Sequence, residues 1–280
     1  MKCVVLCADD YAIAPGVSEA IRQLIAARRI NATSVMTVFP GLEAEAEALA
    51  AAAAQTGASI GLHVTLTGTF APLTAGMAGP AGTLPALPRL VVSALSRRLD
   101  RAAVAAEVEA QFAAFARAFG RPPDHVDGHQ HVHVLPVVRS VVLDATRRHA
   151  PGAWLRDVSP APGALRGLDV KGRLIGAFAA GFARDAAAAG LATNRGFGGA
   201  YDFSAGHDFA GLLAHFLKGV PEGGLVMVHP GRVDDPLTAR DPLTHQREVE
   251  YEVLRGPQHR DILDAADVRL TLPQALQRAA

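Results

Sequence analysis

Short apolar runs that stop at an acidic residue or a histidine recur along this chain. The first run, Cys3–Ala8, is followed at once by Asp9 and Asp10. Apolar runs of this length, bounded by polar residues, are typical of strands that are buried on both faces of a sheet. We expect six further strands of this kind, at residues 33–39, 59–66, 125–129, 154–158, 225–229 and 268–272.

Helical patterns separate several of these runs. Pro15 suits the first turn of a helix that continues to about Arg29, and further helices are expected at 42–54 and 102–119. Alternation of strands and helices favours a parallel sheet covered by helices. The chain has 280 residues, half of them hydrophobic, which suits one large domain. We therefore predict an α/β fold, a single barrel-like (β/α) domain over residues 1–280, with an open doubly wound sheet as the alternative.

The composition argues against several classes of function. Lys plus Arg and Asp plus Glu each number 27, so no net charge attracts nucleic acid or an anionic membrane. Charges interrupt the alanine-rich stretches, and the N-terminus lacks the layout of a signal peptide. We therefore expect no membrane span and a cytoplasmic protein. Cys3 and Cys7 would lie about 13 Å apart along one strand, too far for a disulfide.

The polar residues that end these runs are expected to meet in one place. In parallel α/β folds, sites form at the carboxyl ends of the strands. Four separated segments bring acid–base or metal-ligating groups to that edge of the sheet. These groups are Asp9, Asp10, His63, His129 and His229.

Each of these groups also has a purely structural interpretation. Asp9 and Asp10 could cap a helix or face solvent, whereas beside a divalent ion one would neutralise the ion and the other accept a proton. A single histidine in an apolar strand, such as His63, is more often a hydrogen-bonded core residue than a ligand. Its neighbour Gly61 indicates the close approach of a ligand or another backbone.

Two further residues are equally open to interpretation. His229 ends its run just before Pro230 and Gly231, and it either bonds the turn or acts as a general acid, which a near-neutral pKa suits. Arg156 can form an ion pair with Asp157 or another neighbour, or it can bind substrate.

The segment from His125 to His133 carries the densest signal. Its odd-numbered positions are all His or Asp, which a strand would place on one face. On an extended chain His129 and His133 would lie about 13 Å apart, so both could bind one ion only if the backbone turned helical after Gly128. The segment indicates a metal site.

Four motifs occur in a fixed order along the chain. They are Ala8-Asp9-Asp10-Tyr11, Gly61-Leu62-His63-Val64-Thr65-Leu66-Thr67, His125-Val126-Asp127-Gly128-His129-Gln130-His131-Val132-His133, and His229-Pro230-Gly231. Together they closely resemble the motifs of the YdjC-like carbohydrate deacetylases, a family that includes chitooligosaccharide deacetylases and the deacetylases of hopanoid biosynthesis. The resemblance extends from about Lys2 to about Leu263.

The resemblance implies a fold, a cofactor and a set of site residues. The fold is a (β/α) barrel-like domain, and the cofactor is one divalent metal ion held by Asp10, His63 and His129. The family also implies Asp9 as the base, His229 as the acid and, frequently, a homodimer.

Two points of the resemblance concern single positions. Family members usually carry Phe-Gly after the paired aspartates, whereas this chain has Tyr11 and Ala12. Ala12 indicates that the backbone there needs no positive φ. The polysaccharide deacetylases of the NodB type use two histidines spaced as His129 and His133 are, so His133 stays open as a ligand in place of His63.

These features predict a metal-dependent hydrolase that removes the acetyl group from an N-acetylated sugar. Its ligands suit Zn²⁺, Mn²⁺, Co²⁺ or Ni²⁺, and also Mg²⁺. Arg156 and His131 are the candidates for contacting the substrate, and the Pro- and Gly-rich stretch 68–88 is expected to form part of its groove. The alternatives are an amidohydrolase-type barrel, whose His-x-His pair usually ends the first strand, and a metal-dependent sugar-binding protein without catalysis.

Overall fold

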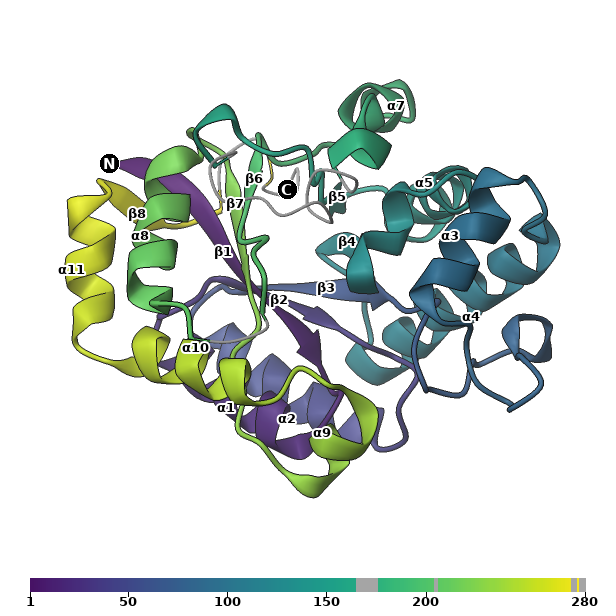
Figure 1. Cartoon of the computed structure of the whole chain (residues 1–280), viewed down its shortest axis with the longest axis horizontal. Helices are drawn as coiled ribbons and strands as arrows, with labels where there is room; N and C mark the ends of the chain where they lie inside the picture. Colours follow the sequence, from purple (N-terminus) through teal and green to yellow (C-terminus); the bar gives the residue numbers. More distant parts are fainter. Residues whose placement is uncertain (165–175, 204–205, 273–275, 277–280) are drawn as a thin grey trace.

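Parallel strands form one curled sheet in the interior of the molecule (Figure 1). The structure is a computed structural model that describes residues 1–164, 176–203, 206–272 and 276. Within these residues seven strands lie in the order β5-β4-β3-β2-β1-β7-β6, and β8 pairs with the first residues of β1. The strands are β1 (Lys2–Tyr11), β2 (Ala32–Val35), β3 (Ser59–Val64), β4 (His125–Gly128), β5 (Trp154–Leu155), β6 (Phe197–Gly198), β7 (Leu225–Val228) and β8 (Val268–Leu270).

The sheet curls far enough for its two outer strands to be linked. Leu155 of β5 forms an isolated parallel bridge with Thr193, and Pro160 forms another with Phe197 of β6. The backbone amide of Ala161 also donates a hydrogen bond to the carbonyl of Phe197 (3.1 Å). The predicted barrel-like domain of parallel strands is therefore confirmed, and the open doubly wound alternative is not adopted.

Helices surround the sheet, and neighbours along the chain pack together, as α1 does with α2 and α4 with α5 (Figure 1). The α-helices are α1 (Pro15–Ala26), α2 (Leu42–Ala54), α3 (Leu87–Leu95), α4 (Arg101–Phe119), α5 (Val138–His149), α7 (Phe182–Ala188), α8 (Phe209–Gly219), α9 (Asp235–Arg240), α10 (His245–Arg255) and α11 (Gln258–Ala265). Short 3-10 helices are η1 (Ala75–Met77), η2 (His129–Val134) and η3 (Pro162–Ala164). Among the described residues, no helix combines the length and apolarity that crossing a membrane requires.

The segment after β4 does not continue as an extended strand. β4 ends at Gly128 and η2 follows, with left-handed backbone at Gln130 (φ 52°) and His131 (φ 60°). The expectation that alternate residues from His125 to His133 share one strand face is therefore wrong beyond Gly128. The turn separates the directions of the histidines that follow it.

The end of β1 is distorted where the two aspartates lie. The register of β1 against β2 shifts between Ala8 and Tyr11, and Asp10 has a φ of 65°. Such a bulge can turn adjacent side chains, which normally face opposite sides of a sheet, toward the same side. Ala12 has a φ of 75°, so the inference that this position needs no positive φ is wrong.

Exchanging Ala12 for glycine is expected to stabilise the protein, because a Cβ atom is strained at this φ. We expect the free energy of unfolding to rise by roughly 0.5–1 kcal/mol, since the greater freedom of glycine in the unfolded chain offsets part of the relief. Urea unfolding measures the change. The control is Ala8→Gly in the preceding strand, β1, where φ is not positive and stability should fall. Equal losses in both variants would contradict strain at Ala12.

Candidate active site

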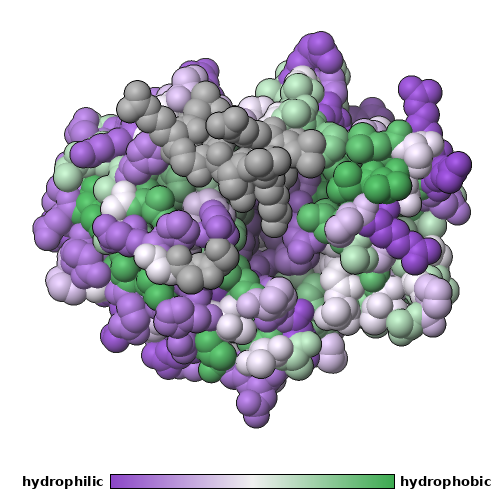
Figure 2. Space-filling view, in the orientation of Figure 1, coloured by the Kyte–Doolittle hydropathy of each residue, from purple (hydrophilic) through white to green (hydrophobic). Residues whose placement is uncertain are grey.

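A pocket opens at the carboxyl ends of β1, β3, β4 and β7, and Figure 2 shows the hollow near the centre of the visible face. It encloses about 880 Å³, part of it open to solvent. Its lining residues are Asp9, Asp10, His63, His129, Gln130, His131, Ala200, Tyr201, Phe203, Met227, His229, Asp241, Pro242, Leu243 and Arg247. Of the eight residues considered in the sequence for a catalytic, metal-binding or substrate-binding role, six lie in this lining, and Arg156 and His133 do not.

Two segments that line the pocket were not predicted from the sequence. They are the segment 200–203, which follows β6, and the segment 241–247, which leads into α10. The stretch 68–88, which was expected to form part of the groove, supplies none of the lining residues. One residue of this stretch, Phe70, nevertheless lies near the site, with its ring 6.1 Å from that of His129.

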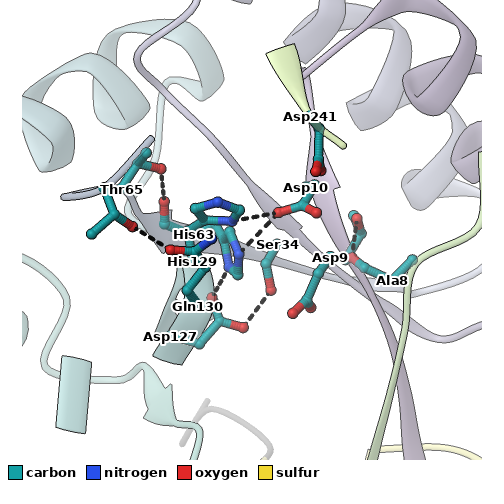
Figure 3. Close-up of polar contacts among 12 residues, drawn as sticks. Ala8, Asp9, Asp10, Ser34, His63, Thr65, Asp127, His129, Gln130 and Asp241 are labelled. Carbon is teal, nitrogen blue, oxygen red and sulfur yellow. Dashed lines mark hydrogen bonds and ion pairs between the residues drawn. The ribbon is translucent and has the colours of Figure 1, made fainter. Parts of the chain in front are cut away.

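Asp10, His63 and His129 direct their polar atoms toward one another (Figure 3). Asp10 Oδ1 lies 3.3 Å from His63 Nε2 and 3.0 Å from His129 Nδ1. All three residues are buried, and their ligand atoms lie within 4.8 Å of one another. One carboxylate oxygen and two imidazole nitrogens form a donor set for a divalent metal ion. These residues therefore fit the ion that the resemblance implies.

Two other groups of described side chains have comparable spacing, but a guanidinium occupies both. The groups are Cys7, His125 and Asp127, and Asp9, His63 and Asp127. Arg156 Nη2 lies 3.2 Å from Cys7 Sγ and 2.5 Å from Asp127 Oδ2. A fixed positive charge at these distances repels a second cation. The group of Asp10 also has a guanidinium beside it, that of Arg247, but this contacts Oδ2 and leaves Oδ1 facing the two histidines, so the group of Asp10 is the better metal site.

Asp127 fixes the ring of His63. His63 Nδ1 donates a hydrogen bond to Asp127 Oδ1 (2.6 Å), so Nε2 faces Asp10. Burial by itself would lower the pKa of His63, but the carboxylates of Asp127 and Asp9 outweigh it and raise the pKa to about 10. A carboxylate bonded to the outer ring nitrogen is the arrangement that orients histidine ligands in metal sites.

Arg156 holds Asp9 in place. Its Nη1 and Nη2 donate to the two oxygens of the Asp9 carboxylate, each at 2.6 Å, and the guanidinium is fully buried. This paired contact fixes the plane of the carboxylate, while each oxygen keeps a further lone pair. Because Nη2 also contacts Asp127, Arg156 links Asp9 to the residue that orients His63.

Arg156 and His133 lie outside the pocket. Arg156 was expected to contact substrate, but its side chain has no exposed surface and its donors face carboxylates of the interior. His133 was left open as a ligand in place of His63, and its Nε2 instead donates to the carbonyl of Arg156 (2.9 Å). The helical turn after Gly128 does form, but it directs His133 into the core.

The second oxygen of Asp10 is held by Arg247. Asp10 Oδ2 lies 2.6 Å from Arg247 Nη2, which lies 2.6 Å from Asp241 Oδ2 as well. Burial would raise the pKa of Asp10, but the positive charge of Arg247 and the hydrogen bonds from His129 and His63 hold it well below its usual range. Asp10 is therefore ionised at neutral pH.

His229 lines the pocket directly after β7. Burial lowers its pKa to about 4, and the raising effect of Asp10 and Asp9 does not overcome it. The imidazole is therefore neutral at neutral pH, and its Nδ1 has no hydrogen-bond partner among the described residues. A neutral imidazole in this position can accept a proton and pass it on.

An apolar wall faces these polar groups. Its side chains are Tyr201, Phe203, Met227 and Leu243. The ring of Phe203 meets that of His229 edge-on, with centroids 5.1 Å apart. The Tyr201 hydroxyl donates to Glu250 Oε1 (2.6 Å), and the backbone amide of His229 donates to Glu250 Oε2 (2.5 Å). Glu250 thus ties the apolar wall to the segment that carries His229.

Glu250 is expected to make stability depend on pH. Burial raises its pKa from 4.5 to about 7. The folded state therefore favours the protonated form of Glu250. The contribution of Glu250 to the free energy of unfolding is fully present below pH 4.5 and is lost as the pH rises through 7. Glu250→Gln keeps an acceptor for the His229 amide and removes the titration. Relative to this variant, the free energy of unfolding of the wild type should fall by roughly 3 kcal/mol over that range.

Urea unfolding of both proteins across this pH range measures the difference, because other titrating groups are common to both. Tyr201→Phe provides a directional check. It removes a hydrogen bond that lowers the pKa of Glu250, so it should shift the loss to higher pH. A difference between wild type and Glu250→Gln that is constant with pH would contradict the raised pKa.

The chain is similar to known proteins over nearly its whole length. The model of a family described as YdjC-like protein matches residues 3–265. A human protein named carbohydrate deacetylase is 30% identical over 254 residues, which cover 84% of this chain and 76% of that protein. A chitooligosaccharide deacetylase of Yersinia pestis is 47% identical over 49 residues, 18% of this chain and 19% of that protein. A solved structure from Enterococcus faecalis V583, described as a cellobiose-phosphate cleavage protein, shares the fold with a TM-score of 0.73, at 22% identity over 97% of both chains.

Proposed function

The chain belongs to the YdjC-like protein family, and from this premise we propose that it removes the acetyl group from an N-acetylated sugar with the help of one divalent metal ion. Relatives named carbohydrate deacetylase and chitooligosaccharide deacetylase support the reaction and the substrate class. The observation that carries the proposal is the convergence, in one pocket, of a metal-type donor set with a further carboxylate and a further imidazole.

We propose Asp10, His63 and His129 as the residues that hold the ion. Their burial, their spacing and the hydrogen bond from His63 to Asp127 support this assignment. A divalent ion in such a site polarises a carbonyl oxygen and lowers the pKa of a water molecule to about 7. The donor set suits Zn²⁺ and its neighbours in the transition series, and Mg²⁺ also accepts it.

Asp9 is proposed as the general base. It lines the same pocket as the three ligands, and Arg156 fixes the plane of its carboxylate. A carboxylate in that position accepts the proton of the attacking water. A binding site without catalysis would not need a further oriented carboxylate, so Asp9 favours an enzyme over a sugar-binding protein.

His229 is proposed to protonate the leaving nitrogen. An amine leaves an acetamide only when it is protonated, and His229 lines the same pocket as the metal-type donors. Because burial keeps its imidazole neutral at neutral pH, it must gain during turnover the proton that it donates. Its Nδ1, which lacks a partner among the described residues, is free for such an exchange.

The remaining lining offers polar and aromatic contacts for a sugar. His131 Nδ1 is buried, has no hydrogen-bond partner among the described residues and belongs to the pocket lining, so we propose that it contacts a substrate oxygen. Tyr201 and Phe203 offer aromatic surface across the pocket. We keep the homodimer that the resemblance implies as a prediction, which sedimentation velocity would test.

Acetate release is the direct test of this function. The purified protein, stripped of metal and then supplied with single divalent ions, is incubated with N-acetylglucosamine and its oligomers. The proposal expects acetate only when a divalent ion is added. A protein that binds these sugars in the presence of metal and releases no acetate would instead be a sugar-binding protein.

His129→Ala is expected to lose most of the bound metal, because it removes one of only three protein ligands. Elemental analysis of the purified variant measures the metal content per chain. His133→Ala is the matched control, since this nearby buried histidine bonds to a backbone carbonyl instead of facing Asp10. It should retain the ion. The ligand assignment fails if His129→Ala keeps full occupancy or if His133→Ala loses it.

A further inference from the structure

We propose that Arg247 positions Asp10 so that only one of its carboxylate oxygens is offered to the metal ion. This inference rests on the metal site of the proposed function, and it assigns a task to a residue outside the three ligands. The two oxygens of Asp10 already have separate neighbours. Oδ1 faces His63 and His129, whereas Oδ2 lies 2.6 Å from Arg247 Nη2.

Arg247 is itself firmly held. It is fully buried, and its Nε donates to the carbonyl of Leu243 (3.0 Å). Its backbone carbonyl accepts a hydrogen bond from the amide of Gly231 (3.0 Å), in the turn that follows His229. Arg247 therefore approaches Asp10 from a rigid position at the start of α10. A side chain anchored in this way can fix the orientation of a carboxylate.

Asp10 requires such an anchor. Its backbone lies in the left-handed region within the bulge of β1, where the ladder to β2 is irregular. Without Arg247 its carboxylate could rotate and present both oxygens to a cation. Keeping Oδ2 occupied limits Asp10 to one bond, so more positions on the ion remain available to water and substrate. Arg247 is thus a positioning residue.

Removing the charge of Arg247 and removing the charge of Asp241 should change the affinity for a cation in opposite directions. Asp10, Arg247 and Asp241 form a chain of negative, positive and negative groups beside the ligands. Removing the positive charge of Arg247 makes the site more attractive to a cation and frees Oδ2. Removing the negative charge of Asp241 leaves Arg247 less compensated, and the site becomes less attractive to a cation.

The experiment compares metal affinity in three variants of the full chain at one fixed pH. Competition with a coloured chelator gives the Kd for Zn²⁺ and Co²⁺. Arg247→Met should bind each ion roughly tenfold more tightly, and Asp241→Asn roughly tenfold more weakly. Arg247→Lys keeps the charge but loses the Nε donor that anchors Arg247 to Leu243, so its Kd should stay within about threefold of wild type.

The visible absorption of bound Co²⁺ reports the number of its ligands. The bands should weaken in Arg247→Met and in Arg247→Lys, because a second oxygen of Asp10 joins the ion in both, and they should be unchanged in Asp241→Asn. A loss of structure alone would lower affinity in every variant. If Arg247→Met and Asp241→Asn both weaken binding while the wild type binds normally, the inference is overturned and the proposed function stands. If the wild type binds no divalent ion, both fail.

Discussion

Asp9→Asn is expected to bind the divalent ion as the wild type does and to lose roughly 10²–10⁴-fold in kcat, the usual weight of general acid–base catalysis. The amide keeps the size of the carboxylate but cannot accept a proton from water. Asp9 lies outside the donor set formed by Asp10, His63 and His129, so metal content should not change. Elemental analysis and steady-state kinetics on the same preparation separate the two effects. Loss of metal together with activity would make Asp9 a ligand instead of a base.

His229→Ala should lose activity in a way that depends on the leaving group. Amide hydrolysis requires a protonated nitrogen, so kcat on an N-acetyl sugar should also fall by roughly 10²–10⁴-fold. An activated acetyl ester expels an anion that needs little help, so the same variant should retain much more of its activity on that substrate. Asp9→Asn should impair both reactions, since both need an activated water. Equal losses of His229→Ala on amide and ester would remove His229 from the acid position.

The barrel and the meeting of the polar residues in one pocket were predictable because both follow from local patterns, whereas the choice of metal ligands among them came from the family resemblance. Short apolar runs alternate with helices, and parallel strands end at one edge of a sheet, so residues that end different runs must meet. This argument brought Asp10, His63 and His129 together without any knowledge of contacts. Gly61 also marked a close approach, although the neighbour is a side chain. A Cβ atom at Gly61 would lie 2.2 Å from the ring of His125.

The charged contacts that orient these groups were not predictable in the same way. Arg247 is separated from Asp10 by 237 positions, and Arg156 from Asp9 by 147. No local spacing connects such partners, because the fold alone brings them together. The strained backbone of Ala12 was missed for a related reason. Alanine ordinarily avoids positive φ, and the bulge of β1 imposes it.

Arg156→Met is expected to lower the free energy of unfolding by roughly 3–5 kcal/mol, measured by urea unfolding without added metal. The guanidinium is fully buried and contacts the carboxylates of Asp9 and Asp127, which are buried as well. Its removal leaves two buried negative charges without this partner. The control is Arg101→Met, which breaks an ion pair with Asp144 whose side chains are each about half exposed. It should cost at most about 1 kcal/mol.

The cause of the lower stability of Arg156→Met can be tested by replacing the two carboxylates that lose their partner. If unpaired charge destabilises Arg156→Met, then adding Asp9→Asn and Asp127→Asn to it should recover much of the lost stability, because a neutral buried network needs no counter-ion. If lost packing of the long side chain is the cause, the triple variant should be no more stable than Arg156→Met. The first outcome would also explain why an arginine lies beneath this site. It allows one carboxylate to orient His63 and another to face the pocket, in an interior where an unpaired carboxylate is costly.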